Sequence, residues 1–214
     1  MWDSPPGVAV KGYCRACDAA VEVVDFAAWP GRCSHCRGQL ETRPLPDVLP
    51  GADAPFRVLF CGINPGTVSA RVRQHFANPA NPFWRALQES GLTPALIAPA
   101  RQAELAALGI GLTNVVARAT PGSADIKAAD IAHGRAALER LVSTRRPVWL
   151  AFVGKEAYRM ATATPARTRV DHGEAGVWHG ARAFVLPSTS PRNAQLSAQD
   201  KVAWFTRLRD AADA

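Results

Sequence analysis

The sequence has no uninterrupted apolar run long enough to cross a bilayer, which argues against an integral membrane protein. It contains no internal repeat and no low-complexity tract, and its apolar fraction of 48% is enough to fill a globular core. The pattern Gly-x-Gly-x-x-Gly is also absent, which argues against a dinucleotide-binding fold. Residues 1–6 lack the basic and apolar regions of a secretory signal, so we expect a cytoplasmic protein.

Negative charge is scarcer than positive charge, and the imbalance is unevenly distributed. The 214 residues include 25 Lys and Arg against 18 Asp and Glu, a formal net charge of +7 at pH 7. Residues 1–50 hold five basic and six acidic residues, whereas residues 51–214 hold twenty and twelve. A positive field on the larger C-terminal part favours a polyanionic partner such as nucleic acid. A basic surface without any partner remains an alternative, because charge alone does not distinguish the two.

Cysteines are few, and four of the five lie within residues 8–42. Cys14 and Cys17 are separated by two residues, fifteen residues follow, and Cys33 and Cys36 repeat the first spacing. Two such pairs supply four thiolates to one tetrahedral metal, so the pattern predicts a zinc ribbon. Two disulfides are the alternative, which the absence of a secretory signal disfavours. Because four thiolates leave no open coordination position, we expect Zn²⁺ to be structural rather than catalytic.

Residues 43–55 contain four prolines and predict a semi-extended linker between the ribbon and a second domain of residues 56–214. In that domain, β-rich apolar runs alternate with helical patterns, which predicts a three-layer α/β/α sandwich around a mostly parallel central sheet. The predicted strands are residues 57–62, 148–153 and 183–186, and the predicted helices are 94–107, 126–144 and those that begin near Asn81, Lys155 and Ser197.

The first predicted strand runs into the turn Gly62-Ile63-Asn64-Pro65-Gly66, at the strand end where open α/β sheets place their ligands. Three further segments accompany this strand-end turn: His75-Phe76-Ala77-Asn78-Pro79-Ala80-Asn81-Pro82-Phe83-Trp84, then Thr113-Asn114-Val115-Val116 with Thr120-Pro121-Gly122-Ser123, and Leu186-Pro187-Ser188-Thr189-Ser190-Pro191-Arg192-Asn193-Ala194-Gln195. Together they resemble the mismatch-specific uracil and thymine DNA glycosylases of the uracil-DNA glycosylase superfamily. The resemblance spans roughly residues 57–210, and the cysteine ribbon lies outside it.

The resemblance implies a role for each matched residue. Asn64 corresponds to the catalytic asparagine that positions a water molecule below the sugar, because an amide is too weak a base to deprotonate water. Phe76 corresponds to the ring that stacks on an extruded base, and Asn114 to the amide that reads its pyrimidine edge. The other implied contacts are to the base at Ile63, Ser69, His75 and Ser188, and to the DNA strand at Ser123, Ser190, Arg192 and Asn193.

The implied activity is monofunctional base excision repair: hydrolysis of the N-glycosidic bond of uracil mispaired with guanine in double-stranded DNA, and of thymine or related deaminated bases. Arg192, in a wedge loop of residues 191–194, would fill the gap that the flipped nucleotide leaves. No lysine lies in the strand-end turn or the wedge loop, which argues against a Schiff-base lyase step. No catalytic cofactor is implied, and we expect a cytoplasmic, nucleoid-associated monomer without membrane contact. Excision of hypoxanthine or xanthine, and an inactive zinc-ribbon DNA-binding protein, remain alternatives.

Carboxylates are sparse in the matched segments. The strand-end turn carries Asn64 where the strongest uracil-DNA glycosylases carry an activating aspartate, which predicts slower chemistry that depends on the leaving group. Asp125 lies just after Thr120-Pro121-Gly122-Ser123, and we expect it to cap a helix rather than to act as a base. The segment 171–174 with His179 superficially resembles a metal cluster, but its glycine and its irregular spacing predict a loop.

The zinc prediction can be tested by metal analysis. We expect the purified wild-type chain to hold about one Zn²⁺ after gel filtration, because the four thiolates form one closed site. Cys14→Ser removes one ligand and should abolish stoichiometric zinc, whereas Cys61→Ser, outside the ribbon, should leave it unchanged. Elemental mass spectrometry gives the ratio, and a wild-type chain without zinc would contradict the ribbon.

Overall fold

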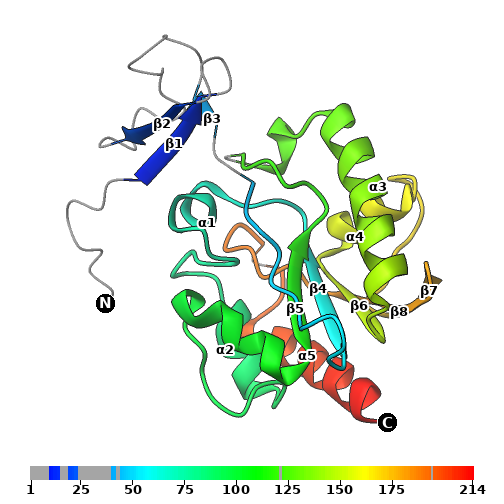
Figure 1. The fold of residues 1–214 in the computed structure, drawn as a ribbon. Coiled ribbons are helices and arrows are strands. Elements are labelled where there is room, and N and C mark those ends of the chain that lie inside the picture. The colour runs from blue at the N-terminus through cyan, green and yellow to red at the C-terminus, as the bar shows by residue number, and fades with distance from the viewer. Residues whose placement is uncertain (1–9, 15–18, 24–39, 42–43, 121, 194) are drawn as a thin grey trace.

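The computed structural model describes residues 10–14, 19–23, 40–41, 44–120, 122–193 and 195–214. Its main feature is a five-stranded sheet with the strand order β5-β4-β6-β8-β7 (Figure 1). The four strands from β5 to β8 in this order run parallel, and β7 is added antiparallel at the edge. The strands are β4 (Val58–Gly62), β5 (Ile110–Asn114), β6 (Trp149–Val153), β7 (Gly173–Trp178) and β8 (Ala181–Leu186).

The central strands form where the sequence is continuously apolar. Every residue of β4 and β6 is buried, as expected for parallel strands that are covered on both faces. Side chains alternate between the faces of the sheet, so Val58 and Phe60 belong to one hydrophobic cluster while Leu59 and Cys61 belong to the other. Cys61 is buried, consistent with a small core hydrophobe.

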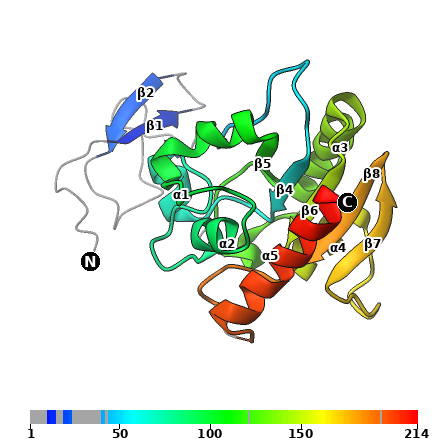
Figure 2. The same ribbon diagram turned by 90° about the horizontal axis from the view of Figure 1, so that it is seen from below.

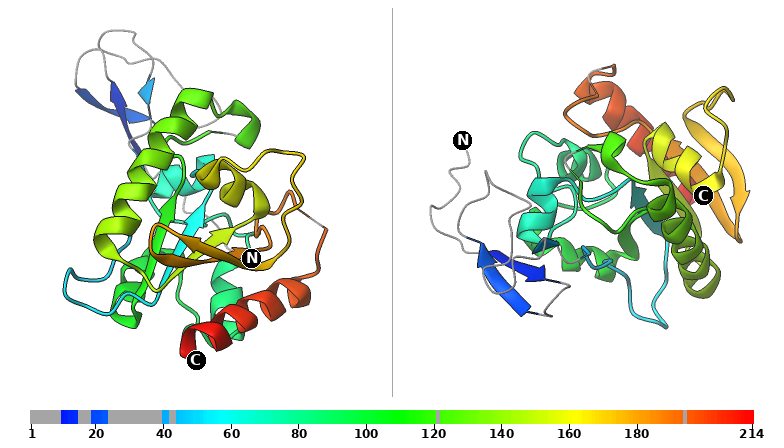
Figure 3. Two further views of the ribbon diagram at one scale, coloured as in Figure 1. Left: turned by 90° about the vertical axis from the view of Figure 1, so that its right-hand side faces the viewer. Right: turned by 90° about the horizontal axis from the view of Figure 1, so that it is seen from above.

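Helices cover both faces of this sheet. On one face lie α2 (Phe83–Glu89), the 3-10 helix η1 (Pro99–Leu108) and α5 (Ala198–Asp213), with α2 beside α5 (Figure 2). The opposite face is covered by α3 (Ala128–Arg145) and α4 (Lys155–Thr162), which pack on each other (Figure 3). The three-layer α/β/α architecture expected from the sequence is therefore confirmed. Two shorter elements, α1 (Thr67–Val72) and the 3-10 turn η2 (Ser123–Asp125), follow β4 and β5.

The predicted helix starts are confirmed where side chains satisfy backbone groups. Asn81 accepts a hydrogen bond from the Phe83 backbone N–H at 3.0 Å, just before α2. Ser197 and Asp200 form a capping box at the start of α5, in which the Ser197 hydroxyl oxygen accepts from the Asp200 backbone N–H at 3.1 Å. The predicted helix 94–107 forms only from Pro99 and as a 3-10 helix.

The segment after residue 171 differs from its prediction. The expected loop is instead the edge strand β7, which pairs with β8 through a register shift between Glu174 and Val177. Gly173 and Gly176 have φ values of 108° and 80°, a conformation that glycine adopts without strain and that the sequence pattern did not reveal.

The N-terminal strands form a separate antiparallel sheet of order β2-β1-β3, from β1 (Val10–Cys14), β2 (Ala19–Val23) and β3 (Leu40–Glu41). Of the predicted zinc ligands, Cys14 ends β1, and Cys17, Cys33 and Cys36 lie outside the described residues. The zinc ribbon therefore stays a prediction. Among the described helices, none combines the length and apolar character needed to span a membrane.

Residues 45–48, within the predicted linker, lie against the sheet. Leu45 is buried. Val48 forms an antiparallel bridge to Leu112 of β5, in which each backbone N–H donates to the partner's carbonyl, at 3.0 and 2.8 Å. The Asp47 carboxylate accepts a 2.7 Å hydrogen bond from the Thr113 hydroxyl. This stretch therefore lies antiparallel to the outer edge of β5, with Leu45 toward the carboxyl ends of the strands.

Gly134 provides a test of how closely α3 packs on the backbone after β5. A Cβ added at Gly134 would lie 1.8 Å from the carbonyl oxygen of Val115. Gly134→Ala therefore forces the helix away, and we expect the free energy of unfolding to fall by about 2 kcal/mol despite the better helix propensity of alanine. Calorimetry should show a Tm lower by roughly 4–8 °C.

Gly51→Ala is the matched control, because its added Cβ would meet only the Ala54 side chain, at the ordinary distance of 3.8 Å. Equal melting temperatures for the two variants would contradict the close approach of α3 to β5.

Candidate functional site

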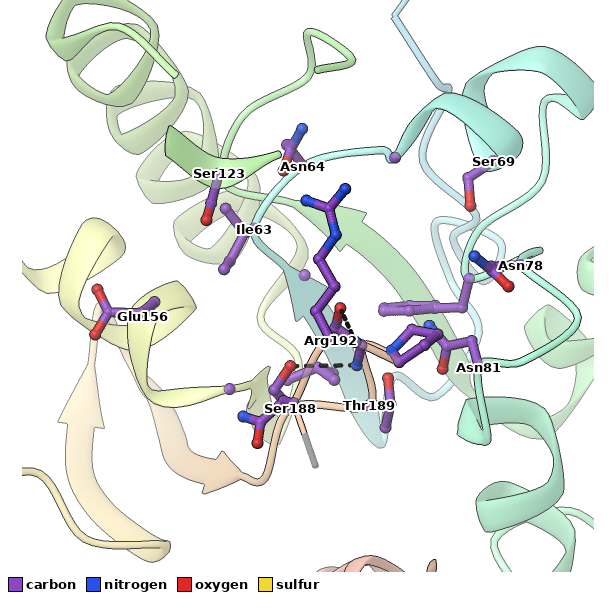
Figure 4. A pocket seen from close by; sticks show the side chains of 18 of the residues that line it. Ile63, Asn64, Ser69, Asn78, Asn81, Ser123, Glu156, Ser188, Thr189 and Arg192 are labelled. Atoms are coloured by element: carbon purple, nitrogen blue, oxygen red, sulfur yellow. Dashed lines mark hydrogen bonds between the residues drawn. The ribbon is translucent and has the colours of Figure 1, made fainter. Parts of the chain in front are cut away.

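A cavity of about 730 Å³ opens at the carboxyl ends of β4, β5, β6 and β8 (Figure 4). This is the place where α/β sheets bind ligands, and the volume suits a small organic group. The structure brings all the base-binding, DNA-binding and catalytic candidates of the sequence to this one cavity. They are Ile63, Asn64, Ser69, His75, Phe76, Asn114, Ser123, Ser188, Ser190, Arg192 and Asn193.

The Asn64 side chain is held in one orientation by its amide nitrogen. Nδ2 donates to the Thr120 hydroxyl oxygen at 2.8 Å and to the Pro65 carbonyl at 3.1 Å. The Thr120 hydroxyl in turn donates to the Gly122 carbonyl at 2.5 Å, so its oxygen is free to accept from Asn64. The amide oxygen Oδ1 is therefore the group that Asn64 offers to a ligand. Thr120, which the sequence did not single out as a site residue, is the residue that orients it.

Asn114 stands beside the strand-end turn because β4 and β5 are parallel and in register. Gly62 pairs with Asn114 at the last position of the two strands. A Cβ added at Gly62 would lie 2.5 Å from Asn114 Oδ1 and 3.4 Å from the Phe76 ring. The glycine at this position is what gives the amide and the aromatic ring their space.

Phe76 has an unusual backbone conformation that carries its ring into the cavity. Its φ of 52° lies in the left-handed region, which a bulky residue adopts only when the surroundings enforce it. Next to it, the Ala77 backbone N–H donates to the Ser69 hydroxyl oxygen at 3.0 Å, which holds the turn. The Phe76 ring stacks on Phe83, with centroids 3.9 Å apart, and this contact supports the ring from behind.

His75 is almost fully buried, with 1% of its surface exposed. Its Nε2 lies 3.0 Å from the Pro46 carbonyl oxygen, and its Nδ1 lies 3.4 Å from Asn114 Nδ2. Burial lowers the pKa of His75 to about 4, against a smaller opposing effect of the Pro46 hydrogen bond. The imidazole is therefore neutral at pH 7.

The wedge loop is braced by a series of short-range hydrogen bonds. The Ser190 backbone N–H donates to the Ser188 hydroxyl at 3.2 Å, and the Arg192 N–H donates to the Ser190 hydroxyl at 3.4 Å. The buried Lys201 ammonium donates to the Asn193 carbonyl at 3.0 Å. The Arg192 side chain extends across the cavity toward Asn64 and Ser123 (Figure 4).

Several cavity residues were not identified from the sequence. Lys155, Glu156 and Lys201 come from the helices after β6 and β8, and His172 comes from the segment before β7. Burial, followed by the charge of Lys155, lowers the pKa of His172. The buried Thr189 hydroxyl has no hydrogen-bond partner among the described residues. Helix placement, rather than any local motif, brings Lys155, Glu156 and Lys201 to the cavity.

Asp125 has the capping role expected of it. Its carboxylate accepts from the Gly122 backbone N–H at 3.0 Å, at the start of η2, and it is not among the described residues that line the cavity. Within the described residues, no three His, Cys, Asp or Glu side chains gather where they could hold a metal ion.

The chain matches a protein-family model over most of its length. The family described as the Uracil DNA glycosylase superfamily matches residues 51–211, which include the whole five-stranded sheet and most of α5. All the described residues that line the cavity except Leu45 therefore lie inside the matched region, whereas Leu45, Pro46 and the predicted zinc ribbon precede it.

The buried neutral His75 predicts a specific pH dependence of stability. The folded chain resists protonation of this imidazole down to about pH 4, whereas the unfolded chain takes up the proton near the ordinary pKa of 6.5. The unfolded state thus binds more protons between these values, and the free energy of unfolding falls as the pH is lowered. Between pH 7 and pH 5 we expect this residue to contribute a loss of about 2 kcal/mol.

Denaturant unfolding at pH 7 and pH 5 measures this loss in the wild type and in His75→Asn. The variant cannot titrate at this position. Its free energy of unfolding should therefore fall by about 2 kcal/mol less than that of the wild type between pH 7 and pH 5. Identical pH dependence in the two proteins would show that His75 is not buried as a neutral group.

Proposed function

The chain belongs to the uracil DNA glycosylase superfamily, and from this premise we propose that it removes uracil mispaired with guanine from double-stranded DNA by hydrolysing the N-glycosidic bond. Superfamily membership supports DNA glycosylase activity in base excision repair. The single observation that carries the finer proposal is the convergence of Asn64, Phe76 and Asn114 on one cavity of suitable size.

Asn64 is proposed to hold the attacking water. Because its Nδ2 is already bonded to Thr120, Oδ1 can accept a hydrogen bond from water and direct the water oxygen toward C1′ of the flipped nucleotide. The C1′–N bond breaks largely before the new C1′–O bond forms, since the amide cannot remove the proton of water outright. The base leaves with the bonding electron pair, and the water proton is released once oxygen has bonded to C1′.

Departure of the base develops negative charge on the pyrimidine, which preorganised donors can stabilise. Within the described part of the chain, no hydrogen bond uses the backbone N–H of Phe76, which leaves it free to donate to a carbonyl oxygen of the base. The same residue offers the open face of its ring for stacking, since its other face packs on Phe83.

Base flipping needs a group that fills the gap in the helix. Arg192 is exposed, projects from the braced wedge loop and reaches across the mouth of the cavity, so we assign it this role. Ser123 and Ser190 are the proposed phosphate contacts, because both residues line the same cavity. Preference for a mismatch follows from the lower cost of unpairing one.

The reaction as proposed uses no catalytic cofactor and forms no covalent intermediate. Two lysines, Lys155 and Lys201, do line the cavity, but Lys201 is buried and bonded to the Asn193 carbonyl. We propose a monofunctional enzyme, and borohydride trapping tests whether Lys155 forms a Schiff base. A monomer acting on DNA in the cytoplasm, with a structural Zn²⁺ in the ribbon, completes the proposal.

A panel of duplexes, each with one lesion opposite guanine, tests the function. We expect free uracil from the G·U duplex under single-turnover conditions, slower release of thymine, and abasic sites that break only on alkali treatment. Borohydride should trap no protein–DNA adduct. If hypoxanthine or xanthine is released faster than uracil, the substrate assignment is wrong, and if no base is released although the duplex is bound, the chain is an inactive DNA-binding protein.

Variants at Asn64 and Thr120 test the mechanism in the same assay. Asn64→Ala should bind the G·U duplex normally but release uracil at least about 100-fold more slowly, because the water loses its position. Thr120→Val removes the hydroxyl that orients the amide, whereas Thr120→Ser retains it. We expect roughly tenfold slower release for the first and near wild-type release for the second. Unchanged turnover in Asn64→Ala would contradict its assigned role.

A further inference from the structure

A series of hydrogen bonds links a segment outside the family match to Asn114 in the cavity. The family match begins at residue 51, whereas the series begins at the Pro46 carbonyl. The Pro46 carbonyl oxygen lies 3.0 Å from His75 Nε2. On the other side of the ring, His75 Nδ1 lies 3.4 Å from Asn114 Nδ2. We call these three residues, Pro46, His75 and Asn114, the relay.

The relay permits only one placement of hydrogen atoms. A carbonyl oxygen can only accept, so the hydrogen of the neutral His75 ring must be on Nε2, where it donates to Pro46. His75 Nδ1 then carries a lone pair and accepts from the Nδ2–H of Asn114. Turning the Asn114 amide over would place Oδ1 against that lone pair, and this repulsion disfavours the alternative orientation.

The middle residue of the relay and its Pro46 end are both held in place by further contacts. The His75 backbone N–H donates to the Gln102 side chain at 2.8 Å, and its carbonyl accepts from the Trp84 indole N–H at 3.1 Å. The Pro46 end is fixed by its neighbours, since Asp47 accepts from Thr113 and Val48 pairs with β5. Residues 45–48, which precede the matched region, therefore hold the carbonyl in place.

We propose that the relay makes His75 a positioning residue. It fixes the positions of Oδ1 and Nδ2 of the Asn114 amide, and this orientation selects uracil over cytosine. This inference builds on the proposed function. In uracil, an N3–H donor stands next to the C4 carbonyl acceptor, whereas cytosine has an N3 lone pair next to an N4 amino donor. The fixed amide offers Oδ1 to N3–H and its second Nδ2–H to the C4 carbonyl, which matches uracil and opposes cytosine.

The protonation pattern can be tested without any reaction. Two-bond ¹H–¹⁵N correlation of the full-length wild-type chain at pH 7 reports which His75 nitrogen carries hydrogen. We expect Nε2 to be protonated and Nδ1 to be bare. A protonated Nδ1 would overturn the relay, whatever the enzyme does to DNA, so this result is independent of the proposed function.

Two variants separate the two hydrogen bonds of His75. Asn places a side-chain oxygen close to the position of Nδ1, so His75→Asn keeps an acceptor for Asn114. Gln places its amide nitrogen close to the position of Nε2, so His75→Gln keeps a donor for Pro46 and removes the acceptor. Both variants replace a buried imidazole by an amide. Because both lose the ring, a difference between them reports which hydrogen bond is retained.

The measurement is the ratio of single-turnover release rates for uracil and cytosine, each opposite guanine, below the melting temperature of every protein. We expect His75→Asn to keep the wild-type ratio within about threefold, and His75→Gln to lower it by roughly 10- to 100-fold. A ratio unchanged in His75→Gln, or lowered equally in both variants, would overturn the selection role. If the wild type itself releases no uracil, the proposed function fails, and the NMR result still decides the relay.

Discussion

The parallel pairing of β4 with β5 determines the geometry of the cavity, because it ends both strands at the same level. Gly62 and Asn114 are partners at the last position of this pairing. The missing side chain of Gly62 leaves room for Asn114 Oδ1 and for the Phe76 ring. The backbone after Gly62 then turns to present Asn64. A shift of one residue in the register would move Asn114 to the other face of the sheet and dismantle the site.

The fold could be predicted where burial produces a continuous apolar run, as in the strands that contain Phe60 and Phe152. The strand β5 was not predicted, because Gly111 and Thr113 interrupt its apolar pattern. Gly111 is required there, since an added Cβ would meet the Phe56 ring at 2.8 Å. Packing partners distant in sequence thus decide residue types that local propensity cannot explain.

Motif resemblance located the cavity residues but could not supply the contacts between them. Asn64 was expected to position water, yet its orientation depends on Thr120, fifty-six residues away. His75 appeared only as a residue beside the base, whereas its ring bridges Asn114 and Pro46. These contacts need the folded backbone, since no spacing rule relates a linker carbonyl to a strand-end amide. The roles of the residues toward DNA stay predictions.

The register shift in β7 has a consequence for the tendency of the protein to aggregate. An exposed edge strand presents unpaired amides that can recruit the edge of another chain and begin aggregation. The shift between Glu174 and Val177 interrupts the regular ladder at this edge of the sheet. Glu174 also forms an ion pair with Arg182 at 3.1 Å, which places charge on the same rim. The edge of the sheet is therefore irregular and charged. This disfavours strand pairing with a second molecule and favours solubility at high concentration.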